Sequence, residues 1–225
     1  MTSWDASAGR KFTKKDKQCS NEYEYAAWSK NKLVVGIDEA GRGPIAGPLA
    51  VAGVVFPVGY DNPDIYDSKA LSEKKRNALF ETIQKDALSY KILLISEQEI
   101  DEKNIYRATQ EAMHAIAEEL KCDIVLTDAM PLPYHHAHQV FDLVKGDQKS
   151  VSIAAASILA KVTRDRLMDE LDQKYPGYGL AKHKGYPTKE HLNALNTLGV
   201  LPIHRRSYRP VAEACHAQMS LDLGE

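Results

Sequence analysis

The segment LVVGIDEAGRGPIAGPLAVAGVVF, residues 33–56, constrains the fold more than any other part of the chain. Its two apolar runs, over about 33–39 and 48–57, have the length of buried strands. A glycine-rich connection joins them, so we expect an antiparallel pair. The first run ends in two adjacent carboxylates, Asp38 and Glu39. Buried charge is costly unless a cation or another partner compensates it, so this pair needs a chemical reason.

Helices and strands alternate along the rest of the chain. Apolar runs predict strands near 90–96 and 122–130 and a weaker one over 139–147. Helical periodicity and capping residues predict helices that begin near Ser72, that span 102–120 and 150–175, and that run from an N-cap at Thr188 to Gly199. This order predicts an α/β fold with a mixed sheet flanked by helices.

Composition divides the chain into three parts. Residues 1–30 are polar, contain the basic cluster RKFTKKDK and show no sustained period, which predicts an N-terminal tail. Residues 31–173 carry the α/β pattern, and residues 174–225 form a helical, basic region and tail. Between 174 and 210 there are seven basic residues and one acid, with histidines and tyrosines among them. Charge alone leaves two interpretations open, a surface that holds a polyanion or an ordinary solvated face.

Several protein classes are excluded by composition. No apolar stretch has the length of a membrane span, and the N-terminus has no apolar core of a secretory signal. The three cysteines, Cys19, Cys122 and Cys215, show no C-x-x-C spacing, so neither a disulfide framework nor a zinc ribbon is supported. We therefore expect a cytoplasmic protein with no membrane partner. The net charge of −2 argues against indiscriminate binding to nucleic acid.

Acids stand at the ends of three predicted strands: Asp38 with Glu39, Asp128, and Asp147. If these strands are parallel neighbours, their carboxyl ends bring the four acids together. Such a cluster persists only with shifted pKa values or bound cations, and oxygen ligands favour Mg²⁺ or Mn²⁺. Adjacent strand residues point to opposite faces, so we expect the strand to break at Glu39, or Glu39 to act at the edge or through its carbonyl. Taken singly, any of these acids fits a polar turn.

The connection GRGPIAG lacks the G-K-[ST] of a phosphate-binding P-loop and does not fit G-x-G-x-x-G. A tight hairpin connection is one interpretation of it. Its position beside the acids favours another, because glycines expose backbone N–H and C=O groups that can bind a sugar hydroxyl. The 2′-hydroxyl is the group that distinguishes RNA from DNA. Arg42 would then be placed to pair with a phosphate.

The motif GIDEAGRGPIAGPLAVAGVV resembles the signature of ribonuclease HII, the type 2 ribonuclease H family. Five further segments resemble elements of that family in the same order: DSKALSEKKR, LTDAMPLP, VKGDQKSVSIAAASILAKVTRDRLM, YPGYGLAKHKGYPTKEH and LGVLPIHRRSYRP. The match runs from about Leu33 to Val211. It implies a ribonuclease H-like mixed β-sheet flanked by helices, with a C-terminal helical extension. One departure is Tyr208, where the family pattern leads us to expect Phe.

The resemblance also implies an activity and assigns roles to residues. It implies an endoribonuclease that hydrolyses the RNA strand of RNA–DNA hybrids and incises 5′ to single ribonucleotides in duplex DNA. Two divalent ions, Mn²⁺ or Mg²⁺, would support hydrolysis to 5′-phosphate and 3′-hydroxyl ends. The implied metal ligands and catalytic acids are Asp38, Glu39, Asp128 and Asp147; backbone groups of Gly41, Arg42 and Gly43 would recognise the 2′-hydroxyl, and Tyr186 would stack at the RNA–DNA junction.

Two other functions deserve comparison. A module that binds hybrids without cutting gains nothing from an acidic cluster beside phosphates. A DNA nuclease or resolvase on the same scaffold needs neither the G-R-G loop nor Tyr186. Near the C-terminus, Gln218, Leu221 and Leu223 resemble the short peptides that dock on the bacterial replication sliding clamp, and a frayed polar tail is the alternative.

Overall fold

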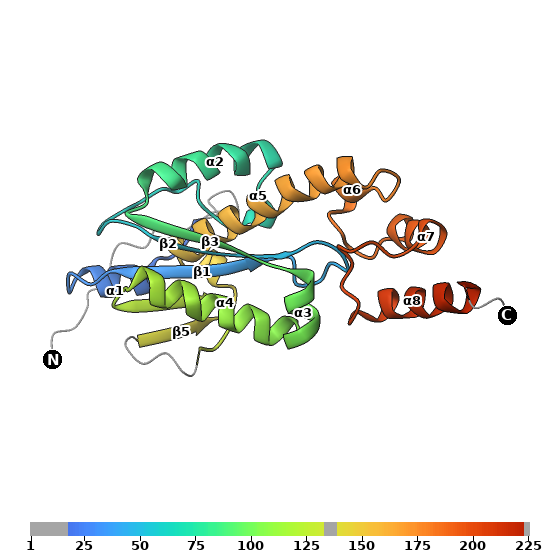
Figure 1. The fold of residues 1–225 in the computed structure, drawn as a ribbon. Helices are drawn as coiled ribbons and strands as arrows, with labels where there is room; N and C mark the ends of the chain where they lie inside the picture. Colours follow the sequence, from blue (N-terminus) through green and yellow to red (C-terminus); the bar gives the residue numbers. More distant parts are fainter. Residues whose placement is uncertain (1–17, 133–138, 223–225) are drawn as a thin grey trace.

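The computed structural model describes residues 18–132 and 139–222, which form one five-stranded sheet with helices on both faces (Figure 1). The strands are β1 (Val34–Ala40), β2 (Leu49–Val55), β3 (Ser89–Ile95), β4 (Ile124–Asp128) and β5 (Gln139–Leu143). They lie in the order β3-β2-β1-β4-β5. The β1–β2 and β2–β3 pairs are antiparallel, and the β1–β4 and β4–β5 pairs are parallel. The predicted mixed sheet, including its first hairpin, is confirmed.

One face of the sheet is covered by α5 (Val151–Lys174), and α2 (Glu73–Asp86) packs on α5 (Figure 1). The long helix begins directly on β1, because a Cβ at Gly36 would lie 2.2 Å from the carbonyl carbon of Ser152. The small residues at the start of α5 permit this approach, and residues 154–156 are fully buried. The predicted long helix and the predicted cap at Ser72, whose side chain accepts from the Lys75 N–H, are both confirmed.

The opposite face is covered by α4 (Ile105–Leu120), which follows the short helix α3 (Glu97–Lys103). The sequence predicted one helix over 102–120, and this prediction is wrong at its start. Asn104 has a φ of 65°, which no α-helix accommodates, and its side chain caps α4 by accepting from the Arg107 N–H. The chain therefore turns between two helices where a single helix was expected.

The expected polar tail differs from the structure in its second half. A short helix, α1 (Glu22–Trp28), lies against the domain, with Glu24, Ala27 and Trp28 buried. The buried and polar positions of α1 are interleaved over only seven residues, so no helical period was visible in the sequence. Residues 1–17, which include the basic cluster, lie outside the described part of the chain.

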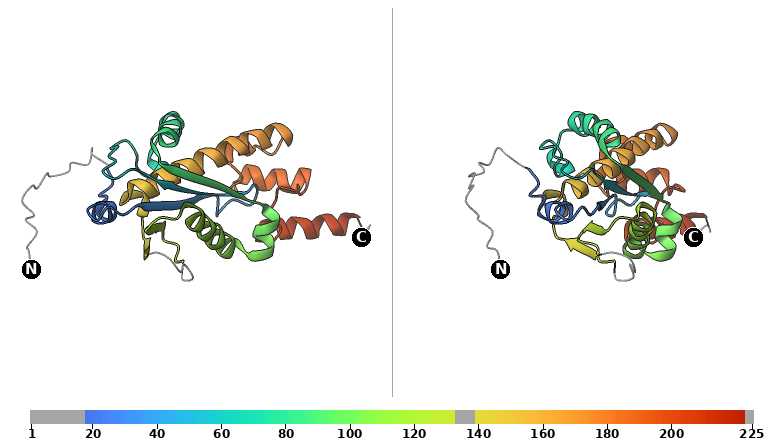
Figure 2. Two further views of the ribbon diagram at one scale, coloured as in Figure 1. Left: turned by 60° about the vertical axis from the view of Figure 1, so that its left-hand side comes forward. Right: turned by 90° about the vertical axis from the view of Figure 1, so that its left-hand side faces the viewer.

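The C-terminal region extends beyond the end of the sheet opposite to α1 (Figure 2). It contains α6 (Leu180–His183), α7 (Lys189–Leu198) and α8 (Arg209–Asp222). The predicted cap of α7 is confirmed, because the Thr188 hydroxyl accepts from the His191 N–H and Gly199 ends the helix with a φ of 90°. Helix α8 was not predicted. Within the residues described, no helix is long and apolar enough to cross a membrane.

Candidate active site

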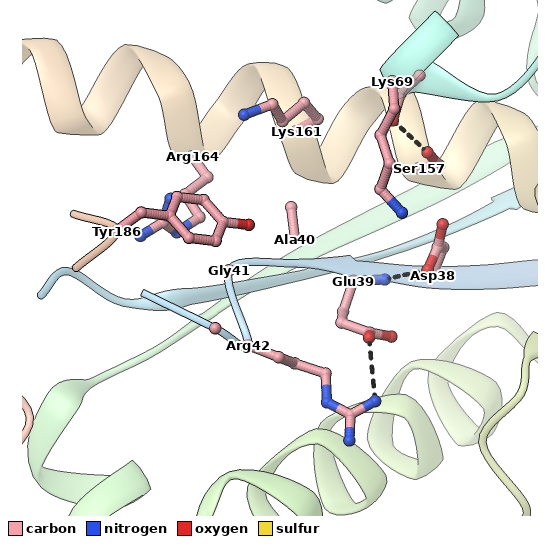
Figure 3. Close-up of a pocket in the computed structure, with 12 residues that line it drawn as sticks. Asp38, Glu39, Ala40, Gly41, Arg42, Lys69, Ser157, Lys161, Arg164 and Tyr186 are labelled. Carbon is pink, nitrogen blue, oxygen red and sulfur yellow. Dashed lines mark hydrogen bonds and ion pairs between the residues drawn. The ribbon is translucent and has the colours of Figure 1, made fainter. Parts of the chain in front are cut away.

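Asp38 occupies the centre of the candidate site, near the end of the central strand β1. Its side chain is only 6% exposed, and one carboxylate oxygen accepts a 2.7 Å hydrogen bond from the N–H of Glu39. Asp38 faces a cleft whose lining also includes Glu39, Ser68, Lys69 and Ser157 (Figure 3). The hydroxyls of Ser68 and Ser157 share a 2.6 Å hydrogen bond that joins the chain before α2 to α5.

Glu39 points away from Asp38, toward the side on which Arg42 lies (Figure 3). Its Oε1 is 3.5 Å from Arg42 Nη1, and its buried Oε2 has no hydrogen-bond partner. Of the three alternatives expected for Glu39, a break in the strand is wrong, because β1 keeps its pairing with β2 through Ala40. The regular strand therefore sends the two neighbouring acids to opposite faces, as pleated geometry requires.

Asp128 and Asp147 approach Asp38 from the next part of the sheet. Asp128 ends β4, and its Oδ1 accepts a 2.8 Å hydrogen bond from the N–H of Gly146. The prediction that a strand runs to Asp147 is wrong, since β5 stops at Leu143 and Asp147 lies in a 3₁₀ turn, η2 (Gly146–Gln148). Lys145, with a φ of 57°, redirects the chain into that turn. The parallel arrangement of β1, β4 and β5 is as expected, so the acids still converge.

The acids destabilise one another's ionised forms. Burial, followed by the charges of Glu39 and Asp128, raises the pKa of Asp38 well above its usual value. Burial, with the nearby Asp67 and Asp128, raises the pKa of Asp147 to about 6. Burial also raises the pKa of Glu39, against the opposing effect of Arg42. The cleft thus concentrates negative charge that its own basic groups do not neutralise.

This donor set suits a hard divalent cation. Carboxylate oxygens are the ligands that Mg²⁺ and Mn²⁺ prefer, a cation would favour the ionised form of the buried Asp38, and Oε2 of Glu39 has no hydrogen-bond partner. Among the described residues, no three Asp, Glu, His or Cys side chains are already gathered tightly enough to hold an ion. Asp38 and Asp128 each accept one hydrogen bond from a backbone N–H, which fixes the orientation of their carboxylates.

The glycine-rich connection forms the other end of the cleft, where Gly41, Arg42, Gly43 and Tyr186 line it (Figure 3). Gly41 has a φ of 103°, and a Cβ there would lie 2.2 Å from Arg164 Nε. A Cβ on Gly43 would lie 3.3 Å from the ring of Tyr186, which is 46% exposed. Of the described residues, none forms a hydrogen bond with the N–H groups of Arg42 and Gly43. Both donors remain free for a ligand.

Two buried arginines hold this loop against the C-terminal region. Arg164 donates to the carbonyls of Pro48, Ala46 and Lys184 at 3.0, 3.1 and 2.9 Å. Arg205 donates to the carbonyls of Gly47 and Arg42. Both side chains are at most 1% exposed. Arg205 is one of the seven basic residues between 174 and 210 that we expected at the surface, and this interpretation is wrong because its guanidinium donates to backbone carbonyls inside the protein.

Buried histidines support the turn that carries Tyr186. The His191 ring nitrogen Nδ1 lies 2.9 Å from the Tyr186 carbonyl, and its Nε2 lies 3.1 Å from Nε2 of His204. Because Leu201 N–H donates to His204 Nδ1, the neutral His204 donates from Nε2 and His191 donates to Tyr186. Burial lowers the pKa of His204 to about 4, which keeps this chain of bonds neutral.

Sequence reasoning gave little weight to several residues that shape the site. Lys69 is surrounded by carboxylates: burial lowers its pKa, but Asp147, Asp38 and other acids raise it more. The motif DSK was the available signal. No motif in the sequence indicated that α1 contacts the start of α5. Asn21 Oδ1 accepts from the Val151 N–H, and Glu24 accepts from Ser150 and Ser152, so α1 supports the segment that follows Asp147.

Comparison with known proteins decides the family. The family model for ribonuclease HII matches residues 35–211. A ribonuclease HII of Listeria monocytogenes serotype 4a (strain HCC23) is 54% identical over 185 residues, which cover 81% of this chain and 70% of the relative. The chain belongs to the ribonuclease HII family. Ribonuclease H-type enzymes typically depend on divalent metal ions, in agreement with the acidic donor set of this site.

Solved structures of ribonuclease HII-type enzymes share the fold. Ribonuclease H2 from Pyrococcus horikoshii OT3 superposes with a TM-score of 0.74 at 28% identity, covering 82% of this chain and 98% of that one. RNase HII from Archaeoglobus fulgidus, solved in a complex with PCNA, gives a TM-score of 0.68 at 29% identity, with coverage of 78% and 95%. The ribonuclease H-like sheet with C-terminal helices is thus confirmed.

Proposed function

We propose that the chain exerts its ribonuclease HII activity on RNA–DNA hybrids in the cleft between Asp38 and Tyr186, and that it also incises 5′ to a single ribonucleotide embedded in duplex DNA. One observation carries the proposal. Four acids, three of which (Asp38, Glu39 and Asp147) have pKa values raised by burial and by neighbouring acids, lie beside a glycine loop with free backbone donors. The acids would act on a phosphate, and the neighbouring loop in the same cleft would recognise the ribose.

The four acids Asp38, Glu39, Asp128 and Asp147 are proposed to hold two divalent cations, Mg²⁺ or Mn²⁺. When bound, such ions activate a water for in-line attack and stabilise charge on the leaving oxygen. The water oxygen bonds to phosphorus and releases a proton to solvent, the P–O3′ bond breaks, and the departing 3′ oxygen takes up a proton from solvent. The products carry 5′-phosphate and 3′-hydroxyl ends. Asp38, which like Asp147 is only 6% exposed, has its carboxylate oriented by the bond from the Glu39 N–H.

Recognition of the ribose is assigned to the glycine loop. The N–H groups of Arg42 and Gly43 are free donors among the described residues, and an oxygen on C2′ would accept from them. The ring of Tyr186 lies beside Gly43, where a Cβ would approach it to 3.3 Å, and is exposed enough to stack on a sugar or base at the junction. The guanidinium of Arg42 is 40% exposed and can reach a phosphate while it neutralises Glu39.

Residues 174–225 are proposed to bind the flanking duplex. Support comes from basic side chains that remain at the surface, since Lys182 is 75% and Arg209 88% exposed. Much of the local positive charge is already paired, however: Lys182 with Glu190, Lys184 with Asp169, and Arg209 with Glu213. We therefore expect this region to make a few phosphate contacts and a shallow dependence of affinity on salt.

A cleavage assay tests the proposed function. The substrate is duplex DNA with one ribonucleotide, compared with an all-DNA duplex of the same sequence and with a long RNA–DNA hybrid, in Mg²⁺ or Mn²⁺. We expect incision 5′ to the single ribonucleotide, cutting of the hybrid, and no cutting of DNA. EDTA and the variant Asp38→Asn should each abolish both reactions.

Each unexpected result would remove a different part of the proposal. Cutting of long hybrids alone would refute the role given to Tyr186 at the junction. Cutting of the all-DNA duplex would point to a DNA nuclease. If the protein bound these substrates but cut none of them with either metal, a binding module would become the better description.

A sliding clamp is proposed as a partner of the C-terminus. Gln218 and Leu221 lie on the last turns of α8, and Leu223 lies outside the described residues. Support comes from the Archaeoglobus RNase HII, which was solved in a complex with PCNA. Removal of residues 218–225 should abolish binding to the bacterial clamp in a pull-down with purified proteins while cleavage of free substrate persists. Unchanged clamp binding would refute this partner.

A further inference from the structure

The Arg42 carbonyl oxygen, in the middle of the glycine loop, accepts two hydrogen bonds from the segment before α8. The hydroxyl of Tyr208 donates to it at 2.6 Å, and Nη1 of Arg205 donates at 3.2 Å. Arg205 Nη1 also lies 3.1 Å from the Tyr208 hydroxyl oxygen, to which it donates. The three groups form a closed triangle, although Arg42 and Tyr208 are 166 residues apart in the sequence.

This triangle fixes the orientation of one peptide group. A carbonyl oxygen has two acceptor sites, and here both are occupied. Because the peptide group between Arg42 and Gly43 is planar and trans, its N–H points opposite to its C=O. Holding the Arg42 carbonyl against Arg205 and Tyr208 therefore directs the Gly43 N–H away from them. Gly43 lines the cleft, and its N–H has no partner among the described residues.

Arg205 alone cannot hold the peptide group as firmly. Its Nε and Nη2 both donate to the Gly47 carbonyl, at 3.0 and 2.8 Å. These two bonds fix the orientation of the guanidinium against Gly47, at the end of the loop away from Arg42. Its bond to Arg42 is the longest of the set. The shorter bond comes from the Tyr208 hydroxyl, a group that Phe, the residue expected at this position from the family pattern, does not have.

We propose that Tyr208 is a specificity-positioning residue, whose hydroxyl orients the Arg42–Gly43 peptide so that the Gly43 N–H is presented to the 2′ oxygen of the ribonucleotide. The inference rests on the proposed function of the glycine loop and extends it to a residue outside the cleft lining. Tyr208 does not touch the substrate; it acts through the carbonyl that it holds.

The test measures ribose discrimination in binding. In an Asp38→Asn background, which prevents cleavage, dissociation constants are measured for a duplex with one ribonucleotide and for the all-DNA duplex, in Mg²⁺. The variant Tyr208→Phe removes only the hydroxyl. Tyr178→Phe is the matched control, because the Tyr178 hydroxyl also donates to a buried carbonyl, that of Gly199, at 2.7 Å. Thermal unfolding of both variants reports the general loss of one hydrogen bond.

We expect Tyr208→Phe to lower the preference for the ribonucleotide duplex by about threefold to tenfold, the usual range for one hydrogen bond, while Tyr178→Phe leaves the preference unchanged. An unchanged preference in Tyr208→Phe would overturn the inference. An equal loss in both variants would also overturn it, because the effect would then be one of packing. If the parent protein shows no preference for the ribonucleotide, the proposed function itself fails, and the inference fails with it.

Discussion

One end of the cleft gathers acids that lack enough bases, whereas the other end gathers buried bases that have no acids. Burial and the charges of neighbouring acids, Asp128 among them, raise the pKa values of Asp38 and Asp147 beside β1. Arg164 and Arg205 lie at the opposite end, where each donates to backbone carbonyls and, within the described residues, neither forms an ion pair. Burial, and then the charge of Arg205, lowers the pKa of Arg164 to about 10.

The two ends differ in whether their buried polar groups find hydrogen-bond partners within the protein. The carbonyl dipoles around the arginines satisfy their donors, so that end is finished as soon as the chain folds. The acids have fewer partners, since Asp38 and Asp128 each accept one backbone N–H, Oε2 of Glu39 has no partner, and carboxylates cannot neutralise one another. We propose that a divalent cation from solution completes their end of the cleft. Three experiments test this contrast between the arginine end, whose donors are satisfied within the protein (the finished end), and the acidic end, whose carboxylates are not (the unfinished end).

The largest effect is expected for Asp38→Asn. Loss of a central carboxylate should reduce the cleavage rate by roughly 10³-fold or more in Mg²⁺. The melting temperature in EDTA should rise, because the pKa of Asp38 is raised in the folded protein and its charge therefore opposes folding at neutral pH. A cleavage assay in Mg²⁺ checks the first point, and scanning calorimetry in EDTA checks the second. The exposed Asp142→Asn on β5 is the control; a lower melting temperature for Asp38→Asn in EDTA would contradict an unfinished acidic end.

A smaller effect, on stability, is expected for Arg164→Lys. Lysine keeps the charge but has no planar fork to reach the carbonyls of Pro48, Ala46 and Lys184, so two of them lose their donor inside the protein. The free energy of unfolding should fall by about 3 kcal/mol. Urea unfolding measures it. Arg166→Lys, two residues away on an exposed part of α5, should change it by about 0.5 kcal/mol or less. Equal effects at the two positions would show that the finished end does not depend on its arginines.

The smallest effect is a dependence of stability on pH at Asp147. Its pKa is about 6 in the folded protein against an ordinary 3.8, so the folded state holds the proton more tightly. In EDTA, stability from this group is therefore lost as pH rises from about 4 to about 6. Since solvent screens part of the charge, we expect Asp147→Asn to gain about 1 kcal/mol relative to the parent across that range. Urea unfolding at several pH values tests this. A difference that is constant with pH would show that Asp147 is already neutralised without metal.

The strands and the convergence of acids were predictable because they rest on local patterns. Apolar runs of strand length that end in Asp38 and Asp128 place both acids at one edge of a parallel sheet. Asp147 was assigned to the site but not to its turn, because the αL residue Lys145 carries no sequence signal for a change of direction. The buried arginines were not predictable. Arginine is normally exposed, and only the folded chain shows that Arg164 and Arg205 face a loop of unpaired carbonyls.

Helix α1 supports the site from outside the residues that the family model matches. The residues that identify the family start at 35, yet Asn21 and Glu24 bind the first turn of α5, and the Cys19 thiol contacts the Asp147 carbonyl at 3.6 Å. A chain shortened to the recognisable family region would keep every acid of the site and lose the bonds that hold the turn bearing the last of them. The residues that support the site therefore begin before the residues that match the family.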